Sequence, residues 1–223
     1  MKPVAMLCLA LSLVPGAARP AAPGARWKIG ESGHVRVWAN WSGSDREIGV
    51  SVERASGADA NVLVFRGTKP ANDPRTHEPI RPAGEPSWEV SLEPGACNAI
   101  TAASEIWVRR TDSTGAVEGT LQWEIPGAER AGDWRVGADS FDTPFEGPAT
   151  SIGYTITSDP SGGDALLQVI RDRTYVEQTV IGAGAAVSGF ADGVTAIRVT
   201  TLGVPASGTY ALMRDVGRRR TGR

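Results

Sequence analysis

The sequence is poor in the residues from which metal and nucleophile sites are built. It has two cysteines and two histidines among 223 residues. His34 opens a strand-like segment and His77 lies in a proline-rich one, and neither has cysteines or carboxylates nearby at the spacing of zinc ligands. The motifs G-x-S-x-G and H-E-x-x-H and a phosphate-binding loop are also missing. These absences favour a protein that is not an enzyme, while a Ser-His-Asp triad, which is defined in space, stays open.

An excess of charge of one sign is missing as well. The chain has 23 basic and 25 acidic residues and a formal net charge of -2. This balance gives no electrostatic reason to bind nucleic acid, so no nucleic-acid partner is expected. Basic residues concentrate only near the C-terminus, in GRRRTGR. We expect residues 216–223 to be a basic disordered tail, and it is the one segment for which contact with an anionic membrane is considered.

The N-terminus lacks an apolar run long enough to span a membrane with ease. Residues 3–14 are apolar, Lys2 precedes them, and Pro-Gly-Ala-Ala follows them. A short positive region, an apolar stretch and small residues are typical of a signal peptide. We therefore expect residues 1–25 to be a signal peptide with an Ala/Pro linker, and the protein to be exported to the periplasm or the extracellular space. A retained apolar arm or an uncleaved anchor is the alternative.

Disulfides are not expected. Cys8 lies inside the apolar run, so removal of the signal peptide would leave Cys97 as the only cysteine. A single cysteine cannot form an internal disulfide, and the hydrophobic core must then stabilise the fold. Cys97 follows a Pro-Gly-Ala turn and is interpreted as a small half-buried residue, with intermolecular pairing as the alternative.

Helical periodicity is absent too, whereas glycine (27) and proline (15) are frequent. Short segments rich in Val, Ile and Trp alternate with turn residues. Six such segments occur in the first half of the chain: VRVWANW, IGVSVER, NVLVFRG, SWEVSLE, EIWVRRT and GTLQWEI. Six more occur in the second half: WRVG, SIGYTIT, ALLQVIRD, TYVEQTVI, TAIRVTT and GTYALMR. The pattern predicts an all-β protein built as a sandwich or small barrel.

The two halves repeat each other. IGVSVERASGADA (48–60) is matched by IGYTITSDPSGGDA (152–165), and GHVRV (33–37) by GDWRV (132–136). IWVRRTDSTGAVEGTL is likewise matched by IRVTTLGVPASGTYAL, in the same order along the chain. We therefore predict two tandem β-sandwich domains of jelly-roll or immunoglobulin-like type that arose by internal duplication. The predicted domains are residues 27–126 and 132–215.

Two features of the repeat predict local structure. In the repeated SGADA and SGGDA turns, Gly57 and Gly162 are expected to adopt positive φ, with Asp59 and Asp164 capping the turn. The first copy also carries extra residues with five prolines, at 69–86. Proline removes a backbone donor and is unsuited to an interior strand, so this segment is expected to be a long surface loop.

Carboxylates gather in two segments that could bind calcium. Ca²⁺ takes oxygen ligands from loops, and no other cofactor is expected. The alternative is that these side chains cap turns or are solvated. The candidate calcium ligands are Asp139, Asp142, Glu146, Asp159 and Asp164.

Tryptophan is concentrated in the first half, which holds or adjoins six of the seven. Trp38 and Trp41 differ by three positions, so in a strand they face opposite sides, and one should be exposed or at a sheet edge. An exposed Trp can stack on a sugar or anchor a partner protein. The candidate contact surface comprises Trp38, Trp41, Trp88 and His77, with burial in the core as the alternative.

The closing pattern of each copy, a Gly-containing turn and then a strand opened by Gly-Thr, resembles small sandwich domains of secreted bacterial proteins and of virion surfaces. We expect an exported, non-enzymatic binding or assembly protein that contacts a protein or glycan partner through the first domain. One alternative is a structural subunit of a surface layer, filament or virion that self-associates. The other is a small secreted hydrolase using Asp139, Asp142 or His77.

Overall fold

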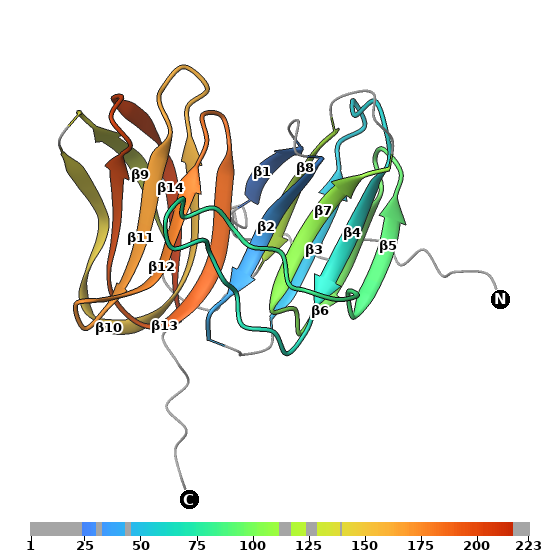
Figure 1. The fold of residues 1–223 in the computed structure, drawn as a ribbon, viewed down its shortest axis with the longest axis horizontal. Coiled ribbons are helices and arrows are strands. Elements are labelled where there is room, and N and C mark those ends of the chain that lie inside the picture. Colours follow the sequence, from blue (N-terminus) through green and yellow to red (C-terminus); the bar gives the residue numbers. More distant parts are fainter. Residues whose placement is uncertain are drawn as a thin grey trace, which may run out of the picture.

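The fold is all-β, as predicted (Figure 1). The computed structural model describes residues 24–29, 33–42, 46–111, 117–123, 129–138 and 140–215, and these residues form fourteen strands and no helix. Nearly all of the predicted signal peptide and all of the predicted tail, 216–223, lie outside the described residues. No helix in the described part of the chain has the length and apolar character needed to cross a membrane.

The N-terminal half contributes eight strands. They are β1 (Gly24–Ile29), β2 (His34–Asn40), β3 (Glu47–Val52), β4 (Ala60–Phe65), β5 (Trp88–Leu92), β6 (Cys97–Thr101), β7 (Glu105–Arg110) and β8 (Val117–Trp123). The C-terminal half contributes six strands. They are β9 (Glu129–Val136), β10 (Phe141–Ser158), β11 (Ala165–Arg171), β12 (Thr174–Ile181), β13 (Ala186–Thr201) and β14 (Ala206–Asp215). The sequence pattern missed β1, β6 and the N-terminal parts of β10 and β13.

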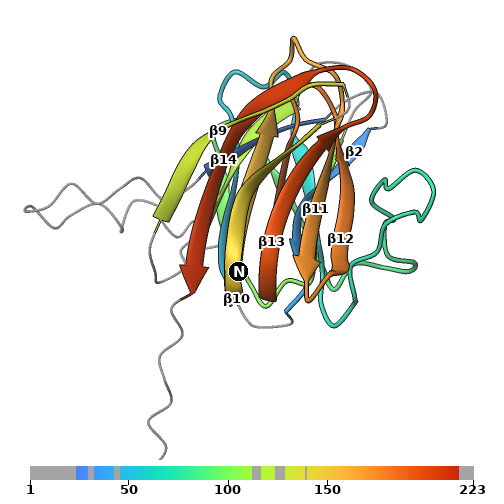
Figure 2. The same ribbon diagram turned by 90° about the vertical axis from the view of Figure 1, so that its left-hand side faces the viewer.

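The strands form two sheets, consistent with a β-sandwich. The smaller sheet has the order β1-β8-β3-β6. The larger sheet has ten strands, in the order β5-β4-β7-β2-β13-β10-β14-β9, with β11 paired to β13 and β12 paired to β11. The larger sheet therefore runs through both halves of the chain, which lie side by side in Figure 1 and are turned end-on in Figure 2.

A short parallel pairing joins the two halves. Ala39 and Asn40 of β2 pair with Gly189 and Phe190 of β13. The N–H of Trp41 extends this contact by donating to the carbonyl of Phe190 at 2.8 Å. The two halves predicted as tandem domains therefore share one continuous sheet.

Strand pairing is equivalent in the two halves, although β10 and β13 each correspond to two consecutive strands of the N-terminal half. The N-terminal part of β10 pairs with the C-terminal part of β13, and the C-terminal part of β10 pairs with β14. In the N-terminal half the corresponding segments are separate strands, β2 and β3, and β6 and β7. Ala102, between β6 and β7, has φ 55°, and Gly193, inside β13, has φ 67°. The same left-handed corner thus recurs, and the duplication itself stays a prediction.

A tryptophan packed over a glycine is the clearest structural feature that the two halves have in common. Trp27 of β1 pairs with Gly119 of β8, and Trp134 of β9 pairs with Gly208 of β14. A Cβ atom at either glycine would overlap the paired indole ring or the carbonyl of the neighbouring strand. This pairing makes Trp134 equivalent to Trp27. It corrects the sequence alignment, which matched GDWRV to residues 33–37 and so aligned Trp134 with Val35.

A hydroxyl pair beside each glycine corrects the alignment again. The Ser51 and Thr120 hydroxyls lie 2.7 Å apart, and the Thr157 and Thr209 hydroxyls also lie 2.7 Å apart. Ser51 therefore corresponds to Thr157, two positions further along than the match of IGVSV to IGYTI implies. A shift of two keeps the same face buried, so sequence similarity could not detect it.

The repeated Gly-Asp turns form without the predicted left-handed glycines. Neither Gly57 nor Gly162 has positive φ. The carbonyl of Asp59 accepts the N–H and hydroxyl of Thr111, and the carboxylate of Asp164 accepts the N–H of Ala183 at 3.0 Å. Asp59, through its backbone carbonyl, and Asp164, through its carboxylate, thus bind neighbouring segments, and the predicted capping of the turn stays a prediction.

Each half has its own hydrophobic cluster. The first cluster includes Trp27, Trp38 and Ile48 and also takes in Phe190 and Met213 from the C-terminal half. The second includes Trp134, Tyr154 and Ile197, with Trp41 of the N-terminal half packed against it. Each cluster therefore buries side chains from the other half, which adds apolar contact to the shared sheet.

Candidate functional site

The tryptophans predicted to form a contact surface are largely covered. Trp38 is fully buried in the first cluster, so a ligand cannot reach it, and its predicted role is corrected. Trp41 and Trp88 are half-buried and pack against the second and first clusters, respectively. The reason is that β2 pairs with β7 on one side and β13 on the other, so it is an interior strand.

The proline-rich segment 69–86 is an ordered tie between the two halves (Figure 1). The amide of Asn72 donates to the carbonyl of Gln178 at 2.6 Å and to the hydroxyl of Thr179 at 2.7 Å. The carbonyl of His77 accepts the N–H of Val180 at 3.2 Å. Among the described strands β12 pairs only with β11, so this segment covers an edge that would otherwise be open to pairing with another chain.

The same segment has a rigid internal turn and also contacts the N-terminal half. The carboxylate of Asp73 accepts the backbone N–H groups of Arg75 and Thr76 at 2.7 and 2.9 Å, and these bonds lower the pKa of Asp73. The guanidinium of Arg81 lies 5.5 Å from the centre of the Phe65 ring. The segment therefore rests on both halves, and His77 is half-buried within it.

A buried polar cluster lies beneath this segment, where the two halves meet. Arg36 of β2 lies between Glu105 of β7 and Glu177 of β12, at nitrogen–oxygen distances of 3.5 and 3.3 Å. The side chains of all three are at most 2% exposed. Arg36 also donates to the carbonyl of Ala71 and the amide oxygen of Asn72. The cluster therefore holds one buried cation against two buried carboxylates.

The two carboxylates of this cluster are unequally satisfied. Glu177 accepts hydrogen bonds from the hydroxyls of Tyr154 and Thr179 in addition to Arg36. Glu105 accepts the indole N–H of Trp107 at 3.1 Å on Oε2, whereas its buried Oε1 has no hydrogen-bond partner. Burial raises the pKa of Glu105, and the nearby charge of Arg36 opposes the rise only in part. Burial without a partner for Oε1 thus favours the protonated form of Glu105.

Tyr154 completes the cluster from the C-terminal core. Burial raises the pKa of its hydroxyl well above the ordinary range, and the negative charge of Glu177 raises it further. The hydroxyl therefore remains protonated and donates to Glu177. Because Arg36 and Glu105 come from the N-terminal half and Glu177 and Tyr154 from the C-terminal half, the cluster is interpreted as an element that joins the halves.

The predicted calcium ligands do not converge. Among the described residues no group of three or more His, Cys, Asp or Glu side chains could hold a metal ion, and Asp139 lies outside them. The carboxylate of Asp142 accepts the N–H groups of Arg135 and Thr143, and that of Asp159 accepts the hydroxyl of Ser207 at 2.6 Å.

Cys97 also differs from expectation. It is disulfide-bonded in the structure, although no internal disulfide was predicted. The only other cysteine of the chain, Cys8, lies outside the described residues.

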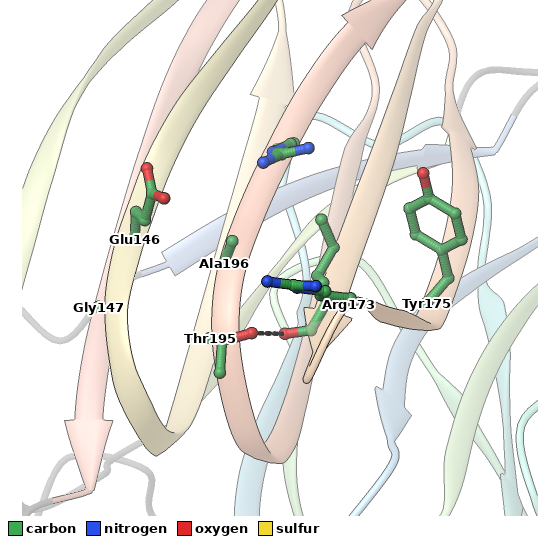
Figure 3. Close-up of a pocket in the computed structure, with 8 residues that line it drawn as sticks. Glu146, Gly147, Arg173, Tyr175, Thr195 and Ala196 are labelled. Atoms are coloured by element: carbon green, nitrogen blue, oxygen red, sulfur yellow. Dashed lines mark hydrogen bonds between the residues drawn. The ribbon is translucent and has the colours of Figure 1, made fainter.

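A pocket of about 520 Å³ lies on the outer face of the C-terminal half (Figure 3). Ile197 and Val199 of β13 belong to the second cluster, so Ala196 and Arg198 point to the opposite face of the strand. We call this pocket the outer groove. Its lining residues are Glu146, Gly147, Ile170, Arg173, Tyr175, Thr195, Ala196 and Arg198.

The outer groove has an apolar floor and charged walls. Ile170 and Ala196 are 7% and 5% exposed although they lie outside the second cluster, so outer-face side chains cover them. Thr195 donates its hydroxyl to the carbonyl of Ile170 at 3.2 Å, which ties β13 to β11 at this point. In Figure 3, Glu146 and Tyr175 stand at opposite ends of the groove, with Arg173 between them.

Both arginines of the outer groove are free to bind a ligand. In the described part of the chain no carboxylate lies within ion-pair distance of Arg173 or Arg198. The Arg198 guanidinium lies 5.0 Å from the centre of the Phe141 ring, and its Nε is buried without a hydrogen-bond partner. An aromatic ring beneath a guanidinium fixes its plane and leaves the N–H edge available.

Arg173 is held in a strained turn. It is the second residue of the two-residue loop between β11 and β12, which is closed by the pair Arg171 and Thr174. Asp172 and Arg173 have φ values of 45° and 67°. Such loops favour Asn-Gly or Asp-Gly, because a side chain in the left-handed region costs about 1 kcal/mol or more. The strain places an arginine at the groove where glycine would be more stable.

Sequence reasoning named only Glu146 among the residues of the outer groove. Arg173 could have been found, because a glycine-free two-residue connection between ALLQVIR and TYVEQTVI is unusual. Arg198 and Tyr175 carry no such signal, since a charged or aromatic residue on the outer face of a strand is ordinary.

Comparison with known proteins finds similarity to solved structures. No family model matches it, and no curated protein matches it. It is similar to HutD from Pseudomonas fluorescens, with 14% identity, a TM-score of 0.28, and coverage of 86% of this chain and 78% of that one. It is also similar to a conserved protein of unknown function from Pseudomonas aeruginosa, with 17% identity, a TM-score of 0.26, and coverage of 87% and 76%.

A third similarity is to a chain in the structure of Sulfolobus Turreted Icosahedral Virus. The identity is 12% and the TM-score 0.27, with coverage of 92% of this chain and 98% of that one. Similarity at this level assigns neither a family nor a function to the chain.

Proposed function

We propose that this is an exported, non-enzymatic binding protein whose ligand occupies the outer groove through a negatively charged group. One observation carries the proposal: Arg173 and Arg198 line the same pocket, and neither is neutralised by a carboxylate among the described residues. A guanidinium presents a planar set of N–H donors that matches a carboxylate, sulfate or phosphate group.

The setting of the two arginines supports a binding role. Arg198 lies on β13, which is paired on both sides by β10 and β11, so its position is fixed by the sheet. Arg173 is fixed by a tight turn at the end of the same sheet. Backbone strain at a surface turn, with no packing gain for the side chain, is a recognised mark of a functional position.

The proposal moves the contact surface from the first half of the chain to the second. Trp38 is buried and Trp41 and Trp88 are half-buried, whereas Tyr175 in the groove is 50% exposed. Export remains part of the proposal and rests on the character of residues 1–25. The intact mass of the native protein tests it, because cleavage after Ala18 would remove Cys8 and leave Cys97 as the only cysteine, without its disulfide partner.

Binding of small anions tests the role of the groove. Titration calorimetry at low salt should detect an anionic ligand for the wild type and at least tenfold weaker binding for Arg198→Gln and Arg173→Asn. Asparagine tolerates left-handed φ, so the turn should remain intact. Arg26→Gln is the matched control, since Arg26 is exposed on β1 and pairs only with Glu53 at 3.4 Å. Equal binding by all four proteins would contradict the proposal.

A further inference from the structure

We infer that the ligand of the outer groove is an acidic saccharide, that is, a sugar carrying a carboxylate or sulfate group. The inference rests on the proposed function and adds the chemical class of the ligand. Three features of the groove beyond its arginines carry it: the position of a carboxylate, the exposure of an aromatic ring, and the size of the pocket.

Glu146 sets the first requirement on the ligand, which must offer hydrogen-bond donors to a carboxylate. It lines the same pocket as Arg173 and Arg198 but pairs with neither of them. An ionised carboxylate accepts hydrogen bonds and repels other anions. A simple inorganic anion would gain from the arginines and lose from Glu146. A ligand with hydroxyl groups at some distance from its anionic group would gain from both ends of the groove.

Tyr175 sets the second requirement on the ligand, which must offer an apolar face to an aromatic ring. Half of its surface is exposed, at the end of the groove opposite Glu146 (Figure 3). An exposed tyrosine ring held on a strand is a rigid apolar platform that loses little entropy on binding. The C–H face of a sugar ring is a natural partner for such a platform, whereas a bare phosphate or sulfate ion has no apolar face to offer.

The pocket size sets the third requirement. A volume of about 520 Å³ falls within the usual range for small-molecule sites and far exceeds the space that an inorganic anion occupies. The floor of Ile170 and Ala196 is apolar, and Thr195 and Tyr175 add hydroxyl groups to the walls. A ring compound with polar groups at its edge fits a site with an apolar floor and polar walls.

The effect of Glu146→Gln on ligand affinity distinguishes a saccharide from a bare anion, because the two ligands predict changes of opposite sign. If the ligand is an acidic saccharide, Glu146→Gln removes a charged acceptor of ligand hydroxyls and weakens binding several-fold. If the ligand is a simple anion, the same change removes repulsion and strengthens binding. The substitution keeps the side-chain size, and Glu146 is exposed, so folding should be unaffected.

The experiment uses four probes with the full-length protein at low salt. They are a galacturonate tetramer, that is, a galactose tetramer in which one terminal unit is galacturonate, the neutral galactose tetramer, inorganic tripolyphosphate and a tetraglutamate peptide. We expect the galacturonate tetramer to bind at least tenfold more tightly than each of the other three. Tyr175→Ala should weaken this binding about tenfold, while Tyr175→Phe, which keeps the ring, should retain it.

Each outcome separates the inference from the proposed function. Tripolyphosphate or the acidic peptide binding as tightly as galacturonate, with stronger binding by Glu146→Gln, would overturn the saccharide while leaving anion binding in place. Equal binding of the acidic and neutral tetramers, or no binding that depends on Arg198, would overturn both.

Discussion

The buried carboxylate of Glu105 should make this protein less stable at alkaline pH than at mildly acidic pH. The cluster of Arg36, Glu105 and Glu177 carries a net negative charge when both carboxylates are ionised. Glu177 is satisfied by Arg36 and two hydroxyls, whereas Oε1 of Glu105 is buried without a partner. The informative perturbation is Glu105→Gln, which keeps the side-chain size and an acceptor for the Trp107 indole.

The magnitude follows from opposing electrostatic effects. At an effective dielectric constant of about 20, one ion pair at 3.5 Å is worth about 5 kcal/mol. Repulsion between the two carboxylates, which share the guanidinium of Arg36, offsets part of this. Burial of a second carboxylate costs several kcal/mol more. We therefore expect Glu105→Gln to change the unfolding free energy at pH 8 by about 0 to 2 kcal/mol, in the stabilising direction.

A second variant, Arg36→Met, removes the cation of the buried cluster. Arg36→Met leaves two buried carboxylates without a counter-charge and should lower the unfolding free energy by about 3–5 kcal/mol at pH 8. Part of this loss should be recovered as the pH falls and the carboxylates take up protons. Comparison of the two variants separates loss of an excess charge from loss of the charge that balances the cluster.

The pH dependence has a definite sign. The pKa of Glu105 is raised above 4.5 in the folded protein, so between 4.5 and its folded pKa the native state binds more protons than the unfolded state. Stability from this group is therefore fully present below pH 4.5 and is lost as the pH rises through the folded pKa. Each unit by which the pKa is raised contributes about 1.4 kcal/mol.

Urea unfolding followed by tryptophan fluorescence between pH 4.5 and 8.5 measures the effect. The difference between Glu105→Gln and the wild type should grow with pH and approach its smallest value at pH 4.5. Taking the difference cancels the opposite contribution of groups such as Asp73, whose pKa is lowered. A difference that does not vary with pH, or a glutamine variant that is more than about 2 kcal/mol less stable at pH 8.5, would refute the reasoning.

Three further predictions concern packing, the tie between the halves and the strained turn. Gly208→Ala should cost about 3 kcal/mol in denaturant unfolding because a Cβ overlaps the strand beneath it, while Gly137→Ala, which meets only an ordinary contact, should cost less than about 1 kcal/mol. Asn72→Ala should cost about 2–3 kcal/mol, against less than about 1 kcal/mol for Asn61→Ala, whose hydrogen bond to Glu89 is exposed. Arg173→Gly should raise the melting temperature by about 2–4 °C while weakening anion binding by the groove; an unchanged melting temperature would argue against strain at this turn.

The fold class was predictable because it depends on local signals. Alternation of apolar and polar residues and frequent turn residues indicate strands wherever they occur. The repeated Gly-Thr at 119 and 208 pointed to equivalent closing strands, and both glycines do lie under an indole. The order of strands in each half, in contrast, follows from pairings that the residues of one strand do not specify.

The continuity of the larger sheet was not predictable. It depends on the pairing of two residues of β2 with two residues of β13, which are separated by about 150 positions in the chain. Nothing in either segment is unusual for a strand. The covering of Trp41 follows from this pairing, and Trp38 is buried in the first cluster, so the predicted tryptophan surface failed for a tertiary reason.

The sequence by itself determined that this chain is all-β, internally similar and turn-rich, because those properties come from the side chains of neighbouring residues. Only the tertiary structure decided which charges are buried and which are available to a ligand. Glu177 meets Arg36 across 141 residues, and it faces inward because the extra residue Val176 in the bulge of β12 shifts the alternation of the strand. A side chain's partner depends on long-range pairing, and a one-residue bulge reverses the face that it occupies.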